Sequence, residues 1–392
     1  MSTAFPNPPA PASFLGRHRI LSPTAGVKVS PLCLGAMNFG DAWKDFLGEC
    51  NKDTAFEILD YFYSQGGNFI DTAVNYQFGQ SEEWVGEWME SRSVRDQMVL
   101  ATKFTGSQTS HIKDVIQSNF GGNNAKNIHT SVERSLKQLR TSYIDVYYLH
   151  LWDHSTSVPE IMHALNDLVT SRKVIYLGIS DTPAWLVVKM NTYARQHGLR
   201  QFSLYQGRWS AAERDMEREI IPMCIDEGLA IAPWGALGGG YFKPKEQWGK
   251  DGTRKFAASA TGKEEKVSAV LDSIAKRKDT LITSVALAYV MHKAPYTFPI
   301  VGGRKVEHLK ANIAALGLKL TEEDIKEIDR AYGFEMGFPH SMFNPDNVML
   351  LGPEDNRFNT RFGTFDYVLG PQPIPPHEGP LDKPFKATAP PP

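Results

Sequence analysis

The sequence predicts an α/β fold: a closed (β/α)8 TIM barrel with an extension at each end. Short apolar runs typical of buried strands alternate with amphipathic stretches typical of helices over residues 28–331. Three of the runs end in an ionisable residue, namely Asp71, Lys103 and His150. Because strand carboxyl ends converge on one face of such a barrel, we expect these side chains to lie close together.

Eight strands and the helices between them can be placed in order along the chain. The strands are expected at residues 32–35, 68–71, 98–103, 144–150, 174–179, 202–206, 229–234 and 298–301. The helices are expected at residues 54–65, 82–90, 127–139, 159–170, 184–197, 216–227, 281–292 and 321–331. The interval 235–297 is too long for one helix and predicts a long loop with an additional helix.

The two ends differ from the barrel in composition. Residues 1–27 begin with a segment rich in proline and small residues, which predicts a flexible N-terminal segment. Residues 332–392 form a C-terminal extension that is rich in aromatic residues and ends in a Pro-rich tail. Three placements of this extension stay open: over the barrel mouth, against another subunit, or against the outer helices.

Composition favours a small-molecule partner. The 42 Lys and Arg residues balance 44 Asp and Glu residues, so no cationic field attracts nucleic acid or a membrane surface. No signal peptide and no apolar run of about 18 residues is recognised, which predicts a cytoplasmic protein. Cys33, Cys50 and Cys224 lack metal-ligand spacing, and no further ligand completes a site at His150, so no metal is expected.

Asp71, Tyr76, Lys103 and His150 are suited to act as one proton-transfer unit. A tyrosine with its usual pKa of about 10 is a poor acid at neutral pH, but a neighbouring ammonium lowers that pKa. We therefore expect Asp71 to hold Lys103, and Lys103 to lower the pKa of Tyr76. His150 would orient a carbonyl oxygen, and a cofactor must supply the hydride because no side chain does so.

These motifs resemble those of the aldo-keto reductase superfamily over residues 28–331. The resemblance rests on GNFIDTA at residues 67–73 with Tyr76, on Thr102-Lys103, and on Tyr148-Leu149-His150. Residues 178–185 and 337–343 are most similar to the fungal aryl-alcohol dehydrogenases and norsolorinic acid reductases. The resemblance implies reversible reduction of an aldehyde or ketone to an alcohol by an NADP-dependent oxidoreductase, with a place in fungal secondary metabolism.

The resemblance also implies an NADP(H) site along the later strands. Ser180 and Gln206 match family residues that bind the nicotinamide carboxamide, whereas Asp181 replaces the usual asparagine and, when ionised, cannot donate a hydrogen bond. The pyrophosphate loop matches Trp234, Gly235, Leu237 and Gly238. Gly302, Arg304, Lys305, His308 and Asn312 match the segment for the adenine-ribose end, where the two cations favour NADPH over NADH.

A substrate pocket is expected at the mouth of the barrel. Met37, Trp43, Trp152 and Trp209 are placed there by the predicted loops, and they favour an aromatic or bulky carbonyl substrate. The main alternative is a noncatalytic NADPH-sensing regulatory subunit on the same barrel, as in potassium-channel β subunits. The chain has no GxGxxG or P-loop pattern, and a homo-oligomer is an open possibility.

Overall fold

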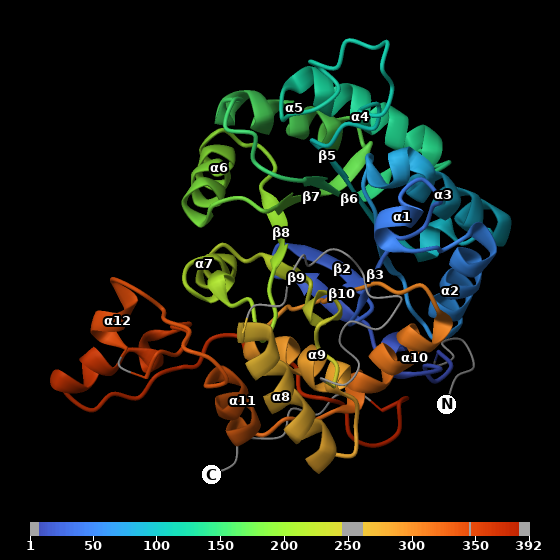
Figure 1. Ribbon diagram of the computed structural model, residues 1–392. Helices are drawn as coiled ribbons and strands as arrows, with labels where there is room; N and C mark the ends of the chain where they lie inside the picture. Colours follow the sequence, from blue (N-terminus) through green and yellow to red (C-terminus); the bar gives the residue numbers. More distant parts are fainter. Residues whose placement is uncertain (1–7, 245–261, 345, 384–392) are drawn as a thin grey trace, which may run out of the picture.

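The predicted (β/α)8 barrel is confirmed. The computed structural model describes residues 8–244, 262–344 and 346–383 of the 392-residue chain. Eight parallel strands form one sheet in the order β10-β3-β4-β5-β6-β7-β8-β9, and a parallel bridge from Ile231 to Thr297 links its two edges (Figure 1). The strands are β3 (Cys33–Gly35), β4 (Phe69–Asp71), β5 (Val99–Phe104), β6 (Ile144–Leu149), β7 (Val174–Ser180), β8 (Phe202–Arg208), β9 (Ala230–Trp234) and β10 (Ile300–Val301).

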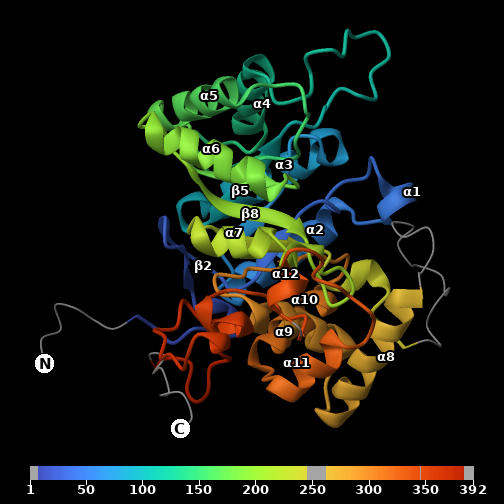
Figure 2. The same ribbon diagram turned by 90° about the vertical axis from the view of Figure 1, so that its left-hand side faces the viewer.

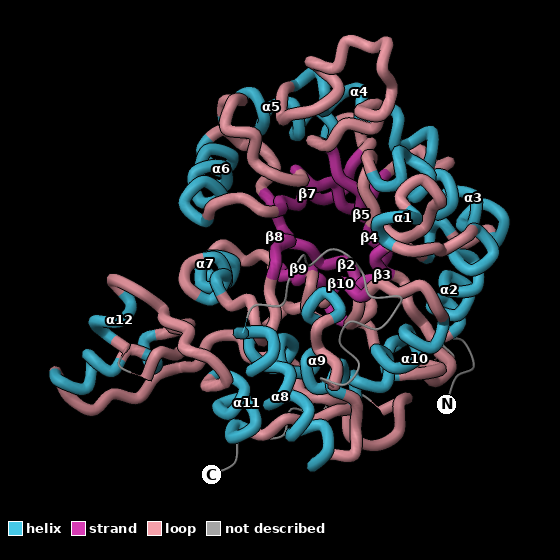
Figure 3. The backbone as a smooth tube through the Cα atoms, in the orientation of Figure 1, coloured by secondary structure: helices cyan, strands magenta, loops and turns pink. Residues whose placement is uncertain are grey.

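Helices surround the strands on the outside, as Figure 3 shows by colour. They are α1 (Lys44–Leu47), α2 (Lys52–Ser64), α3 (Gln80–Arg92), α4 (Ala125–Gln138), α5 (Val158–Thr170), α6 (Ala184–Gln196), α7 (Ile220–Asp226), α8 (Gly262–Arg277), α9 (Ile282–Lys293), α10 (Val306–Ala314), α11 (Glu322–Asp329) and α12 (His340–Phe343). The apolar sides of α2 to α11 pack on the sheet in one extensive core, whereas α12 buries no residue and lies away from the strands in Figure 3. Among the described residues, no helix combines the length and apolar character that crossing a bilayer requires.

Local sequence signals set several helix boundaries. Asn51 and Ser157 accept hydrogen bonds from the first turns of α2 and α5, and Thr321 and Asp324 form a capping box on α11. The helix expected at residues 216–227 is divided into a 3-10 turn, η4 (Asp215–Glu217), and α7. Pro222 explains the division, because proline lacks the N–H that a helix begun at residue 216 would need there.

A β-hairpin lies where the sequence predicted flexibility. Strands β1 (Arg19–Ser22) and β2 (Ala25–Val29) pair antiparallel, and the 3-10 turn η1 (Phe14–Gly16) precedes them. Buried Leu21, Ala25 and Val29 pack on the inner barrel residues, which explains why the segment is ordered. Figure 2 shows β2 on the side of the barrel opposite α1.

The C-terminal extension begins against the outer elements of the barrel. The Phe334 ring packs on the guanidinium groups of Arg214 and Arg218, 4.4 and 4.6 Å from its centroid. Short 3-10 turns η8 (Pro353–Asp355) and η9 (Arg357–Arg361) follow α12. Near its end, the tail is fastened to the N-terminal segment, because Arg17 donates to the carbonyl of Leu381.

Some predicted segments lie outside the described residues. They are residues 1–7 of the N-terminal segment, residues 245–261 of the long interval, and residues 384–392 of the Pro-rich tail. Helix α8 lies within the interval in which the sequence predicted an additional helix.

Candidate active site

A buried ion pair lies at the carboxyl ends of β4 and β5. The ammonium of Lys103 donates to Oδ1 of Asp71 at 2.5 Å and to the carbonyl of Thr72 at 2.7 Å. The Lys103 side chain has no solvent exposure, and Asp71 has almost none. Burial alone would lower the pKa of Lys103, but the charge of Asp71 and the contact with Tyr76 outweigh burial and raise that pKa. Lys103 is therefore held as an ammonium.

Tyr76 is the next group outward from this ion pair. It begins the 3-10 turn η2 (Tyr76–Gly79), which follows β4, and its hydroxyl lies 3.5 Å from Nζ of Lys103. The sequence led us to expect a lowered pKa for Tyr76, and the structure corrects this. Burial raises the pKa of the phenol, and the nearby Lys103 charge offsets only part of that effect. At neutral pH the group is a phenol with a proton to donate.

His150 completes the group and is held neutral. Its ring lies edge-on to the Tyr76 ring, with centroids 5.7 Å apart. Burial and the charge of Lys103 lower the pKa of His150 to about 3. Nδ1 is buried without a hydrogen-bond partner among the described residues, and a neutral imidazole has one nitrogen that donates and one that accepts.

The residues that the sequence predicted to bind the nicotinamide lie along the carboxyl ends of β7 and β8, next to the end of β9. Ser180 pairs in register with Gln206, and the Gln206 amide donates to Oδ2 of Asp71 at 2.9 Å. Oγ of Ser180 is buried and interacts with the neighbouring Asp181 carboxylate. Asp181 accepts a hydrogen bond from the Trp234 indole at 3.2 Å. Desolvation raises the pKa of Asp181, and this hydrogen bond partly offsets it.

A glycine-rich loop follows β9 and leaves room for a ligand. Gly235 and Gly238 adopt positive φ values of 74° and 68°, which favour glycine. A Cβ atom added at Gly239 or Gly240 would meet no atom within 4 Å. Leu237 anchors the loop by packing on the main core. The loop can therefore bring backbone N–H groups close to a phosphate.

Two cationic residues precede α10 after β10. Arg304 lies against the loop after β3, because a Cβ atom at Gly48 would be 1.8 Å from its Nη1 atom, and Lys305 is exposed. A Cβ atom at Gly302 would contact the Gly35 carbonyl oxygen at 3.5 Å, and Gly303 packs next to His308. Asn312 is buried on α10. The cations and the helix N-terminus together suit an anionic group.

Three of the predicted substrate-pocket residues lie in the loops after β3 and β6, and one of them contacts Tyr76. The Trp43 ring lies 6.3 Å from the Tyr76 ring and 5.8 Å from the Phe78 ring. Met37 and Trp152 are partly exposed in the loops after β3 and β6. The Trp43 ring beside Tyr76 suits an aromatic or bulky ligand.

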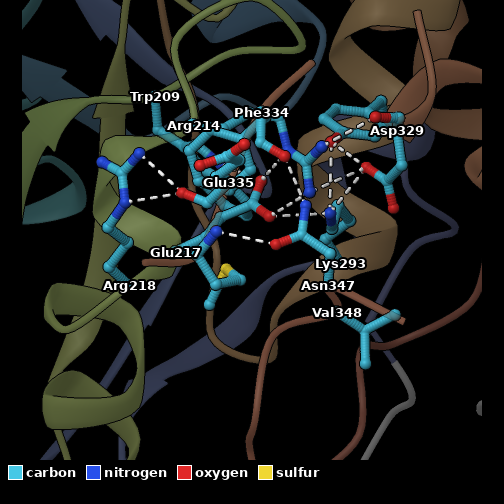
Figure 4. Close-up of polar contacts among 12 residues, drawn as sticks. Trp209, Arg214, Glu217, Arg218, Lys293, Asp329, Phe334, Glu335, Asn347 and Val348 are labelled. Carbon is cyan, nitrogen blue, oxygen red and sulfur yellow. Dashed lines mark hydrogen bonds and ion pairs between the residues drawn. The ribbon is translucent and has the colours of Figure 1, made fainter. Parts of the chain in front are cut away.

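Trp209 lies elsewhere, which corrects its predicted place in the substrate pocket. Its side chain has no solvent exposure, and its indole donates to Glu217 at 3.0 Å. Figure 4 shows Glu217 in a buried ion cluster, where Arg214 and Lys293 both contact Glu217 and Asp329. A side chain without accessible surface cannot line a pocket, so Trp209 is a packing residue here.

Sequence reasoning missed Gln77, which positions the Trp43 loop. Its side chain accepts a hydrogen bond from the Trp43 backbone at 2.6 Å and donates one to the Met37 carbonyl at 3.1 Å. Gln77 is buried at a positive φ of 54°. A glutamine next to a candidate tyrosine carries no sequence signal for such a role.

The described residues hold no group of three His, Cys, Asp or Glu side chains arranged for a metal ion.

Comparisons with known proteins agree with this geometry. A family model described as the aldo/keto reductase family matches residues 31–333. An aryl-alcohol dehydrogenase of Pestalotiopsis microspora is 55% identical over 97% of this chain and 99% of its own. Norsolorinic acid reductase B of Dothistroma septosporum is 56% identical over 92% and 94%, and a putative aryl-alcohol dehydrogenase of Saccharomyces cerevisiae is 47% identical over 88% and 94%. The chain belongs to the aldo/keto reductase family.

Proposed function

We propose that the protein catalyses the reversible, NADPH-dependent reduction of an aromatic or bulky aldehyde or ketone to its alcohol. The observation that carries the proposal is the setting of Tyr76: its hydroxyl lies 3.5 Å from the ammonium that Asp71 holds, and its ring lies edge-on to the neutral His150 ring. Membership of a family that generally uses NAD(P)H supports it. The names of the aryl-alcohol dehydrogenase and norsolorinic acid reductase relatives support the substrate class and a role in fungal secondary metabolism.

The residues of the site have separate tasks in this reaction. NADPH, when bound, supplies the hydride that reaches the carbonyl carbon. Tyr76 donates its proton to the carbonyl oxygen as the C=O bond becomes a C–O single bond. Lys103 stabilises the phenolate that remains, and Asp71 keeps that ammonium in place. The neutral His150 ring orients the oxygen by a hydrogen bond.

Residues for the cofactor follow from the same proposal. Ser180 and Gln206 would bind the nicotinamide carboxamide, and the loop from Trp234 to Gly238 would receive the pyrophosphate. Arg304 and Lys305 would bind the phosphate that distinguishes NADPH from NADH, with Asn312 at the adenine. Met37, Trp43 and Trp152 would contact the substrate.

The test compares Tyr76→Phe with the wild-type enzyme on a panel of aromatic aldehydes. We expect turnover to fall about a hundredfold or more, because a general acid contributes on this order, while NADPH affinity measured by fluorescence stays unchanged. Tyr143→Phe is the matched control, because that hydroxyl donates to Asp96 near the protein surface. Near-normal turnover in Tyr76→Phe would contradict the proposal. Oxidation of one bound NADPH without further turnover in the wild type would instead support the regulatory sensor.

A further inference from the structure

A large cavity lies between the two ends of the chain, away from the candidate active site. Its volume is about 1010 Å³, and its walls come from the N-terminal segment, the C-terminal tail and the loops next to them. In Figure 2 the described part of the C-terminal tail, drawn in red, lies on the side of β2, opposite α1. The volume is at the upper end of the usual range for small-ligand pockets, about 300–1,000 Å³.

The walls of the cavity are mostly apolar. Phe14, Ile20, Leu316 and Ile374 contribute large apolar side chains, and several prolines add further apolar surface. Ile20 and Ile374 are exposed to solvent, although a folded chain gains free energy by burying such residues. An apolar ligand body would cover part of this surface.

The same walls carry positive charge. Arg17, Arg19 and Lys383 line the cavity, whereas Asp382 is the one acidic residue among the described lining residues. Arg17 is already used by the protein, because it donates to the carbonyls of Leu381 and Lys383 at 2.5 and 2.8 Å. These two bonds hold the tail as one wall of the cavity.

Arg19 differs from Arg17 in having its donors free. Its guanidinium makes no hydrogen bond or ion pair with any other residue that the structure describes, and its residue is only partly exposed. Burial, and next the charge of Arg17, lower the pKa of Arg19 to about 10. A partly buried guanidinium beside a like charge is stabilised when an anion binds to it.

We propose that this cavity binds an amphipathic carboxylate, with its carboxylate on Arg19 and its apolar body against Phe14 and Leu316. The planar fork of an arginine matches a carboxylate with two parallel hydrogen bonds. The apolar walls select a ligand that carries a long or aromatic body on that carboxylate. The site lies outside the proposed active site and does not depend on the proposed reaction.

A fluorescence titration of the full-length protein with dansyl-labelled undecanoic acid tests the proposal. We expect saturable binding that Arg19→Met weakens about tenfold or more, because a charge-assisted hydrogen-bond pair is lost. The matched control is Arg200→Met, which removes an exposed arginine outside the cavity and should leave binding unchanged. Equal affinity in the wild type and Arg19→Met would overturn the proposal.

Competition experiments on the wild-type protein show where the probe binds and which chemical groups of a ligand the cavity recognises. Decanoate should displace the probe at a much lower concentration than decanol, and inorganic phosphate should displace it poorly. Equal displacement by decanol would rule out the contact between the ligand carboxylate and Arg19. Strong displacement by phosphate would rule out the contact between the ligand body and the apolar walls. Saturating NADP+ should leave the probe bound, and its release by NADP+ would place the probe at the barrel mouth and overturn the proposal.

Discussion

The side-chain amide of Gln206 donates a hydrogen bond to Oδ2 of Asp71 at 2.9 Å, while Lys103 occupies Oδ1. Gln206 lies on β8 and Asp71 on β4, so the bond crosses the interior of the barrel. It joins a residue expected to bind the nicotinamide to the carboxylate that holds Lys103. Both carboxylate oxygens of Asp71 therefore accept a hydrogen bond from a buried side chain.

The first prediction concerns Asp71→Asn. Without the carboxylate, burial would dominate at Lys103 and lower its pKa, so the ammonium beside Tyr76 would be lost as the pH rises. We expect turnover to fall roughly ten- to a hundredfold and its pH profile to shift toward acid. Asp60→Asn, at an exposed pair with Arg92, is the control and should keep the wild-type profile. A fall in turnover with an unchanged pH profile would assign Asp71 to packing alone.

The second prediction concerns the carboxylate of Asp181. If the nicotinamide lies beside Ser180, an ionised Asp181 attracts the positively charged ring of NADP+ and not the neutral ring of NADPH. Asp181→Asn should therefore weaken NADP+ about fivefold relative to NADPH, which corresponds to ~1 kcal/mol between partly screened charges. Equilibrium binding of the two forms, measured by fluorescence, checks this ratio. Equal changes for both forms would show that Asp181 does not distinguish them.

Much of the barrel could be predicted because its signals are local. The runs that form β5 and β6 end close to the predicted residues, and Lys103 and His150 lie at their carboxyl ends as expected. The direction of a side chain was harder to predict from the sequence, because tertiary packing decides it. Trp209 follows β8 as a mouth residue should, yet its indole turns to Glu217. The hairpin at Arg19–Val29 was missed because its apolar residues gain order only by packing on the closed barrel.

The third prediction separates the two cofactors at Arg304. This side chain lies beside Gly48 before α10, where the extra phosphate of NADPH is expected. Arg304→Leu should weaken NADPH about tenfold or more and NADH little, because a guanidinium–phosphate contact is charge-assisted. Titration with each reduced cofactor measures both affinities. Lys326→Gln, at an exposed pair on α11, is the charge-matched control. If the affinities for NADPH and NADH fall equally, Arg304 does not bind the phosphate that distinguishes NADPH from NADH.

The fourth prediction concerns the stability contributed by the ion cluster around Glu217. Glu217 is fully buried and bound to Arg214 at 2.7 Å and Lys293 at 2.9 Å. Glu217→Gln leaves two buried cations to share Asp329, so we expect the free energy of unfolding to fall by about 3 kcal/mol. The control is Glu322→Gln, which breaks the exposed pair with Lys326 and should cost less than about 1 kcal/mol. Urea unfolding of both variants measures the difference.

The same carboxylate makes stability depend on pH in a defined window. Burial would raise the pKa of Glu217, but the charges of Lys293 and Arg214 outweigh burial and lower it from 4.5 to about 2. Because the folded pKa is below the unfolded one, ionised Glu217 stabilises the fold above about pH 4.5 and loses this effect as the pH falls toward 2. The wild type should lose stability more steeply than Glu217→Gln across that window. Parallel curves for the two proteins would show that Glu217 does not contribute this proton-linked stability.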